Sequence, residues 1–394
     1  MPHSVLKPVK EQANWIRGTK FKWNIMKSIL TGISVVDLER LAIENREQAI
    51  AYALNYGLDI QKPETFELIQ NIHIEALQFI ESRFLEDASD IEIPSQVSAL
   101  EHPLDLLIFA SGHGLGKERL IQAWSCAILK VMHCYFQLEH DLKLKNINAI
   151  RRQIYRDYES LIVNDKNGIF LRDDQESLPL FFFKFKRNKD RRSIILKLLH
   201  KRSHVPSDIY DHLGIRFVLN TRAECLLVLD FLWRHNLINE ANIKPSRSKN
   251  TLLSLKAARR LFKKYRPELE QTEGYPEEVF KKIDHELAAY RPELKRNDNP
   301  FSATDYRSIQ ITVRKMIQLQ EDAIFPLPST LIRAPRTSQF YFDYEIQLID
   351  KSTWLKTRRG PTSHAAYKKR QVEVARKRVL GPFLVKTYNL GDRS

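Results

Sequence analysis

The sequence predicts an α+β protein in which a helical N-terminal domain precedes a domain built around a β-sheet. Between about residues 20 and 160, apolar residues recur at three- and four-residue spacing, which is typical of amphipathic helices. After about residue 160 the pattern changes to short runs rich in aromatic and β-branched residues, which is typical of strands. We therefore predict a helical domain over residues 1–160, with a regulatory role suggested only by its position, and an α+β domain over residues 161–394.

The elements follow from the same periodicities, taken in chain order. Helices are predicted in the first domain at residues 35–54, 63–85, 117–142 and 147–163. Strands are predicted next at residues 168–173, 178–186 and 214–220, with a helix at 191–202 before the last of them. Residues 238–298 are again helical and highly charged, and we interpret them as an insertion that is not part of the sheet. Strands at 308–316 and 340–350 and a helix at 368–380 complete the chain.

Composition limits the class of protein and of ligand. With 394 residues and 43% hydrophobic content, the chain can bury a sizeable core. A net charge of +15 predicts attraction to polyanions such as nucleotides, nucleic acids or anionic lipid. Cys126, Cys134 and Cys225 form neither a disulfide framework nor a zinc ligand set, which favours a cytoplasmic location. The sequence shows no apolar signal region and no apolar run long enough for a membrane helix, so we expect no membrane association.

Two features that suggest a ligand site are better explained without one. The glycine-rich segment Ser111–Glu118 has Ser111 where a phosphate-binding loop needs its first glycine, and Glu118 where that loop needs a magnesium-binding hydroxyl. We interpret it as a loop between helices. His133 and the pair His140-Asp141 lie on a predicted helix without further metal ligands nearby, which favours ordinary helix side chains over a metal site.

Basic residues gather at the start of the second domain. They begin within the strand predicted at 178–186 and continue into the next helix: Lys184, Lys186, Arg187, Lys189, Arg191, Arg192 and Lys197. The first turn of a helix has free N–H groups, and guanidinium and ammonium groups can share a polyphosphate with them. The cluster is therefore a candidate phosphate site, with a solvated basic face or a nucleic-acid patch as the alternative.

Acidic and aromatic candidates lie further along the chain. Alternation within residues 340–350 places Asp343, Glu345 and Gln347 on one face of a strand. Two carboxylates from separate segments, Glu345 and Asp211, suit magnesium, which prefers oxygen ligands from a few acidic side chains. Tyr306 precedes a predicted strand and could stack on a purine. Taken singly, a helix cap, an exposed strand residue or packing on the sheet explains each of these residues.

Taken in order, these segments resemble the synthetase domain of RelA/SpoT-type alarmone synthetases over about residues 180–370. The similar motifs are Arg187-Asn-Lys189, Ser193-Ile-Ile-Leu-Lys197, Asp208-Ile-Tyr-Asp211-His-Leu-Gly-Ile-Arg216, Tyr306-Arg-Ser308-Ile, Glu345-Ile-Gln347 and Ser363-His364 followed by Tyr367-Lys368. The sequence departs from the family at Gln310, Ile349-Asp350 and Ser363.

The resemblance implies a nucleotidyltransferase-like fold, with a mixed β-sheet and flanking helices. It also implies transfer of pyrophosphate from ATP to the 3′-hydroxyl of GDP, GTP or another purine nucleotide, with Mg²⁺. The implied roles are phosphate binding for Arg187, Lys189, Lys197 and Arg216; metal binding and catalysis for Asp211 and Glu345; and acceptor-base binding for Tyr306, Ser308, Gln347 and His364.

Two alternatives remain open. The acceptor could be the 3′ end of an RNA such as tRNA, an alternative suggested by the net charge of +15. The chain could also be a catalytically inactive sensor that binds nucleotide or RNA. This alternative is suggested by the differences from the family motifs at Gln310 and Ile349-Asp350.

Overall fold

The computed structural model describes residues 34–186, 190–200, 212–292, 307–320, 337–356 and 364–390, together with Met26, Leu30 and Thr31. The chain forms two compact units, each described here by itself. Unit 1 comprises Met1–Phe136, Leu199–Ser203 and Val374–Ser394, and unit 2 comprises Gln137–Leu198 and His204–Glu373. Within the described residues every strand belongs to unit 2, so the chain is of mixed α+β type.

The units divide the chain at different points from the predicted boundary at residue 160. Helix α9 (Ile147–Glu159) belongs to unit 2 because its apolar side chains, among them Ile150 and Tyr158, are buried in the core of that unit. The end of the chain belongs to unit 1, where the buried Arg376 donates to the Asp87 carboxylate at 2.7 Å. A core made of residues distant in sequence therefore decides the division, and local composition does not show it.

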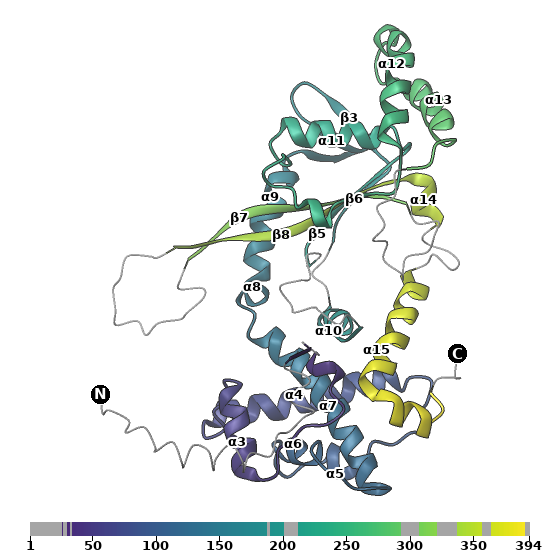
Figure 1. Ribbon diagram of the computed structural model, residues 1–394. Helices are drawn as coiled ribbons and strands as arrows, with labels where there is room; N and C mark the ends of the chain where they lie inside the picture. The colour runs from purple at the N-terminus through teal and green to yellow at the C-terminus, as the bar shows by residue number, and fades with distance from the viewer. Residues whose placement is uncertain are drawn as a thin grey trace, which may run out of the picture. The chain divides into compact units, whose positions relative to one another are not determined.

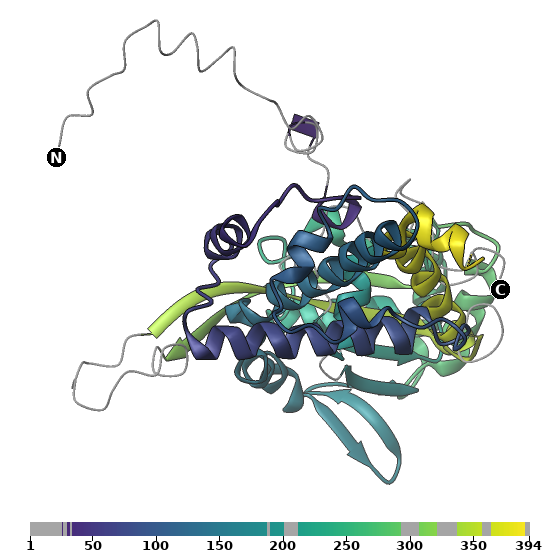
Figure 2. The same ribbon diagram turned by 90° about the horizontal axis from the view of Figure 1, so that it is seen from below.

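Unit 1 is helical where it is described. Its elements are the 3₁₀ helix η1 (Val35–Asp37), α3 (Arg46–Asn55), α4 (Pro63–Phe84), α5 (Ser95–Ser98), α6 (Asp105–Phe109), most of α7 (Lys117–Glu139) and the C-terminal part of α15 (His364–Thr387). The long helix α4, which can be followed in Figure 2, buries Ile69, Ile72, Ala76, Phe79 and Ile80 at three- and four-residue spacing. Its first residue is Pro63. A backbone N–H at this position has no partner within the helix, so a proline there costs no hydrogen bond.

The predicted continuous helix at 35–54 is wrong. Leu38 is extended, with φ −69° and ψ 132°, and α3 begins only after Asn45. The Asn45 side chain accepts a hydrogen bond from the Gln48 N–H at 2.9 Å, which caps the new helix. An asparagine inside an apolar 3.6-residue pattern therefore starts a helix here.

The described residues of unit 2 form two sheets. Strands β1 (Ile162–Asp165), β2 (Gly168–Arg172) and β3 (Ser177–Leu180) form an antiparallel three-stranded sheet. The second sheet has the order β4-β5-β8-β7-β6, from β4 (Phe182–Lys186), β5 (Gly214–Leu219), β8 (Thr337–Asp350), β7 (Ile309–Gln320) and β6 (Lys249–Asn250). Only the β5–β8 pair is parallel, so this sheet is mixed.

Three predictions for unit 2 need correction. The helix expected at 147–163 ends at Glu159, and Ile162 and Val163 pair with β2, since β-branched residues suit a strand. The strand expected at 178–186 is divided at Phe181 between the two sheets. The insertion at 238–298 contains α12 (Leu255–Gln271) and α13 (Glu277–Leu287), but Lys249 and Asn250 pair with β7 and extend the sheet.

The described part of unit 2 also contains α8 (Leu142–Lys145), most of α10 (Arg191–His200), α11 (Glu224–Arg234), α14 (Lys351–Lys356) and the first part of α15, with η3 (Pro245–Arg247) before β6. The helix predicted at 368–380 lies within α15, which bends at Gly381, where φ is 72°. In the part of the chain that is described, no helix has the length and apolarity needed to cross a lipid bilayer.

The five-stranded sheet has one apolar and one polar face. Residues of β5, β7 and β8 that share the apolar face, such as Phe217, Val313 and Ile346, are buried with apolar residues of α9, α11, α12 and α13. Figure 1 shows α11, α12 and α13 on one side of the sheet. Tyr158 of α9 and Tyr344 of β8 meet in this core, with their hydroxyl oxygens 2.7 Å apart. The alternate residues of the same strands form the polar face.

Candidate functional site

Strand register aligns polar residues across the whole five-stranded sheet. Lys184 of β4 lies opposite Arg216 of β5, and Arg216 lies opposite Gln347 of β8. Gln347 is paired with Gln310 of β7, which is paired with Lys249 of β6. Side chains of directly paired residues point to the same face. These five residues therefore form one polar row across the sheet, and it carries three cations.

A second row of polar residues runs beside the first. Lys186, Gly214, Glu345 and Thr312 are paired in turn across β4, β5, β8 and β7. The Lys186 ammonium donates to Glu345 Oε1 at 2.5 Å, and the two side chains are 25% and 19% exposed. Glu345 thus holds its negative charge against a cation two strands away, in a position that solvent reaches only in part.

Gly214 makes the contact between Lys186 and Glu345 possible. It lies on β5, between the strands that carry the two charged residues. A Cβ atom at Gly214 would lie 2.8 Å from Lys186 Cδ and 3.2 Å from the Glu345 carbonyl oxygen. The lysine stem therefore occupies the space that any other residue at this position would fill, and a glycine here permits close approach of its neighbours.

Arg216 and Gln347, the two residues of the first row to which the family resemblance gives a role, are in direct contact. Arg216 Nε donates to Gln347 Oε1 at 2.8 Å. Gln347 is 3% exposed, so this bond satisfies an oxygen that is largely shielded from water. Arg216 is only partly buried. The bond orients the guanidinium over the polar face, next to the pair made by Lys186 and Glu345.

Asp343 behaves differently from Glu345, although both belong to the same face of β8. Its carboxylate accepts from Lys244 Nζ at 3.1 Å and from Arg314 Nε at 3.2 Å. The Asp343 side chain is 13% exposed. Two cations hold this carboxylate and tie β7 and the segment before β6 to β8. Asp343 is therefore a structural residue, whereas Glu345 is held by one cation on a flexible stem.

Tyr155 of α9 holds the ends of the strands that carry the site. Its hydroxyl lies 2.7 Å from the Lys186 carbonyl oxygen and 3.1 Å from the Gly214 carbonyl oxygen. Its ring stacks on Phe185, with centroids 4.2 Å apart. Burial raises the pKa of the Tyr155 hydroxyl, so it stays protonated and able to donate. The tyrosine fixes the point where the chain leaves β4 and where β5 begins.

The structure brings together Arg216, Glu345 and Gln347 among the predicted site residues. Ser308 is buried just before β7, and its N–H donates to Thr251 Oγ1 at 3.0 Å. Lys197 lies on α10, partly buried. Arg187, Lys189, Asp211 and Tyr306 lie outside the described residues, as does the side chain of His364. Their roles stay predictions.

The helix start predicted at Arg191 is confirmed, since α10 begins there. The Arg191 guanidinium, however, pairs with the Glu139 carboxylate at 2.5 Å. Arg191 is therefore engaged by an acid within its own unit. Of the basic cluster, Lys184 and Lys186 lie on the polar face of the sheet.

The described residues fit a magnesium ion only in part. Mg²⁺ takes one or two carboxylates, and water and phosphate complete its shell. Glu345 supplies one such carboxylate, and Asp211, the second residue implied, lies outside the described residues. No group of three or more histidine, cysteine, aspartate or glutamate residues that could hold a metal occurs in the described ranges. A magnesium ion bound by Glu345 would have to replace Lys186 as the partner of that carboxylate.

The two features rejected from the sequence have ordinary structural roles. Segment 111–116 connects α6 to α7, as predicted, and Ser111 Oγ accepts from the Ile43 N–H at 2.9 Å. His133 Nδ1 lies 2.6 Å from the Tyr56 hydroxyl, and burial lowers the pKa of His133. Cys126, Cys134 and Cys225 are free and buried.

Two components of the site were not predicted as such. Lys186 was predicted in a phosphate-binding cluster, but its ion pair with Glu345 was not predicted. Alternation in Phe182–Lys186 places both lysines of β4 on one face, and that signal was available in the sequence. Tyr155 gave no signal beyond its place in an amphipathic helix, because its partners are backbone atoms of distant strands.

Comparison with known proteins found limited similarity. No family model and no curated protein matches the chain. Among solved structures, small alarmone synthetase 2 from Bacillus subtilis aligns with a TM-score of 0.26 and 14% identity, over 63% of this chain and 98% of that one. Small alarmone synthetase 1 from the same organism aligns with a TM-score of 0.25 and 12% identity, over 67% and 95%. Similarities of this size do not establish a family for the chain.

Proposed function

We propose that this chain is an ATP-dependent pyrophosphokinase of the alarmone-synthetase type. It would transfer a pyrophosphate group from ATP to the 3′-hydroxyl of a guanine or other purine nucleotide. The observation that carries the proposal is the polar face of the five-stranded sheet. There, Glu345 lies among the cations Lys186 and Arg216 and the amide of Gln347. Arg216, Glu345 and Gln347 belong to the motifs that resemble those of that class of enzyme.

The charges on this face suit a phosphoryl-transfer reaction. Transfer of a phosphoryl group depends mostly on positioning and on neutralising the charge of the phosphates. The strands contribute five cations and two carboxylates to the face: Lys184, Lys186, Arg216, Lys249 and Arg314, with Asp343 and Glu345. Arg314 pairs with Asp343 and Lys186 pairs with Glu345, and two of the three remaining strand cations, Lys184 and Arg216, lie on the neighbouring strands β4 and β5. We place the triphosphate there.

The reaction assigned to the site is a single displacement. The acceptor 3′-oxygen bonds to the β-phosphorus of ATP, and the bond from that phosphorus to the oxygen bridging it to the α-phosphate breaks. AMP leaves with that oxygen, and the hydroxyl proton passes to the Glu345 carboxylate. Lys186 and Arg216 balance the phosphate charge, together with Arg187, Lys189 and Lys197 if their predicted roles hold. Magnesium, held by Glu345 and Asp211, would supply further neutralisation of the phosphates.

One observation favours the inactive sensor as a second candidate. In the structure the carboxylate assigned to catalysis is already neutralised by Lys186 at 2.5 Å. With a permanent pair of this kind, the basic face would still bind a nucleotide, but Glu345 would act neither as a general base nor as a metal ligand. The two candidates therefore differ in whether Glu345 is needed for turnover.

The test incubates the purified chain with γ-labelled ATP and magnesium, and offers GDP, GTP, ADP, ATP or bulk tRNA in parallel. A labelled product that disappears in Glu345→Gln but persists in Asp343→Asn supports the pyrophosphokinase and names its acceptor. Asp343→Asn is the matched control because it changes a carboxylate two residues away on the same strand face. A labelled tRNA would favour RNA as the acceptor. Nucleotide binding without any product would support the sensor.

A further inference from the structure

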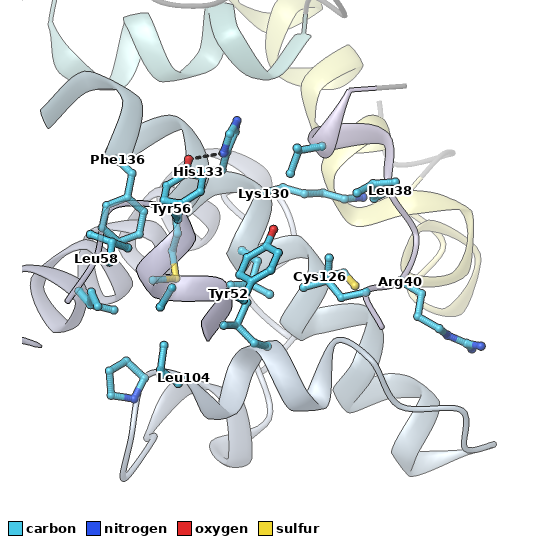
Figure 3. Close-up of a pocket in the computed structure, with 18 residues that line it drawn as sticks. Leu38, Arg40, Tyr52, Tyr56, Leu58, Leu104, Cys126, Lys130, His133 and Phe136 are labelled. Atoms are coloured by element: carbon cyan, nitrogen blue, oxygen red, sulfur yellow. Dashed lines mark hydrogen bonds between the residues drawn. The ribbon is translucent and has the colours of Figure 1, made fainter. Parts of the chain in front are cut away.

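Unit 1 contains an apolar pocket far in sequence from the strands of the polar face. It is lined by residues of η1, α3, α4, α6 and α7 and of the segments next to them, and its cavity volume is about 90 Å³. Its walls are mainly aliphatic, with Leu41, Leu58, Leu104 and Leu107 among the lining residues. Figure 3 shows Tyr52, Tyr56 and Phe136 among the side chains around it. In a pocket of this composition, most of the binding free energy comes from burial of the apolar part of a ligand.

The pocket has positive but no negative lining residues. Among the residues that the structure describes, the cationic ones that line it are Arg40 and Lys130, and no aspartate or glutamate does so. Lys130 is 7% exposed, and its ammonium donates to the Val379 carbonyl oxygen at 3.3 Å. No salt bridge to Lys130 occurs among the described residues. A buried ammonium with one long hydrogen bond has donor capacity left for a ligand.

The two acids whose charges act on Lys130, Asp37 and Glu39, form no salt bridge with it among the described residues. Burial lowers the pKa of Lys130, while the charges of Asp37 and Glu39 act in the opposite direction. The Asp37 carboxylate accepts two hydrogen bonds from the Arg378 guanidinium, at 2.5 and 2.9 Å. Asp37 is therefore engaged by a second cation and does not form a salt bridge with Lys130.

The other titratable side chains of the pocket are neutral near physiological pH. Burial lowers the pKa of His133 and raises the pKa of the Cys126 thiol to about 11. Burial also raises the pKa of the Tyr52 and Tyr56 hydroxyls. Tyr56 bonds to His133, whereas the Tyr52 hydroxyl points toward Lys130 in Figure 3. Lys130 and Tyr52 are thus the two donors on one side of an otherwise apolar pocket.

We propose that this pocket binds a small amphipathic acid, whose apolar body lies against the leucines and whose single carboxylate is bound by Lys130 and Tyr52. A neutral apolar molecule would leave the ammonium without an anion, and an apolar amine would be repelled by it. A nucleotide carries several anionic groups, for which one interior ammonium is too little. Arg40 does not change this, because it is directed away from the other labelled side chains and contacts His113 at 2.6 Å.

The test measures calorimetric binding of decanoate, 1-decanol and decylamine to the full chain, below the concentrations at which they form micelles. Decanoate should bind more tightly than the alcohol, and the amine should bind weakest. Lys130→Met keeps an unbranched apolar side chain and removes the charge, so it should weaken decanoate binding by about tenfold or more while changing 1-decanol binding by less than about threefold. Lys62→Met is the matched control, since the Lys62 side chain is 61% exposed and does not line the pocket.

The proposal is overturned if decanoate binds no better than 1-decanol, if Lys130→Met leaves decanoate binding unchanged, or if none of the three binds. Should Lys130→Met fail to fold, judged by circular dichroism, Tyr52→Phe takes its place and should weaken decanoate binding by a smaller factor. The ranking of the three probes on the unaltered chain tests the charge preference without any variant. None of these outcomes depends on pyrophosphokinase activity.

Discussion

The ion pair between Lys186 and Glu345 should depend on the absence of a side chain at Gly214. The pair has a 2.5 Å contact and side chains that are 25% and 19% exposed, which places it between exposed and fully buried pairs. Exposed pairs contribute about 0.2–1 kcal/mol, and removing one partner of a buried pair costs about 3–5 kcal/mol. We therefore expect a coupling free energy of about 1–3 kcal/mol between Lys186 and Glu345.

Gly214→Ala should reduce that coupling to nearly zero. The new Cβ would lie 2.8 Å from Lys186 Cδ, and the flexible lysine stem is the part that can move away. The 3.2 Å approach to the Glu345 carbonyl oxygen requires a smaller backbone adjustment. Overpacking costs about 1–3 kcal/mol, and the reduced freedom of the unfolded chain returns about 0.4–1 kcal/mol, so the variant should be destabilised by about 1–2 kcal/mol and still fold.

The assay is a double-mutant cycle of Lys186→Met and Glu345→Gln, measured in the natural chain and in the Gly214→Ala background. Hydrogen exchange of peptides from β5 and β8 reports the local free energy of opening, which avoids assuming that both units unfold together. The Lys244 and Asp343 pair, at 3.1 Å on the same face, serves as the control and should keep its coupling in both backgrounds. A Lys186–Glu345 coupling that survives Gly214→Ala, or one below about 0.5 kcal/mol in the natural chain, would refute the reasoning.

Three further predictions concern groups that support the polar face and its core. Tyr155→Phe removes the hydroxyl that contacts two strand-end carbonyl groups. The local free energy of opening at the start of β5 should therefore fall by about 1 kcal/mol, which makes hydrogen exchange there faster. Unchanged exchange would contradict the role given to Tyr155 in holding these strands. Arg216→Lys loses the Nε–H bond to Gln347 and should lower stability by about 1–2 kcal/mol, measured by urea denaturation. Burial raises the pKa of Glu224, so its contribution to stability is complete below the pKa of the unfolded state and is lost as the pH rises through the pKa of the folded state. Glu224→Gln should therefore flatten the decline of the urea midpoint above about pH 4.5. A variant with the same pH profile as the natural chain would exclude this assignment.

Alternation within single strands made part of the candidate site predictable. Asp343, Glu345 and Gln347 were expected on one face of β8, and the burial of the alternate residues Tyr344, Ile346 and Leu348 in the apolar core confirms this. The side-chain period of a strand is two, so one apolar face determines where every polar residue of the strand lies. The same rule would have placed Lys184 and Lys186 on one face of β4, although we predicted them only as members of a basic cluster.

The contacts between strands could not be predicted in this way. Lys186 meets Glu345 only because β5 lies between β4 and β8, and a sequence pattern contains neither strand order nor register. The division of residues 178–186 at Phe181 was missed for a related reason, since an uninterrupted run of apolar residues does not show which sheet each half joins. The start of α3 was missed because one capping bond at Asn45 outweighs the apolar spacing around it.

The pair between Lys186 and Glu345 links nucleotide binding to metal binding if the proposed function holds. Each residue balances the charge of the other in a site that is about three-quarters or more shielded from solvent. A triphosphate that engages Lys186 would leave the carboxylate unpaired, and an unpaired charge in a shielded site is costly. Binding of ATP should therefore increase the affinity of Glu345 for magnesium, and by reciprocity magnesium should increase the affinity for ATP by the same factor. Lys186→Met should raise magnesium affinity in the absence of nucleotide and weaken ATP binding, both measured by calorimetry. A sensor in which Glu345 never leaves Lys186 would instead bind ATP equally well with and without magnesium.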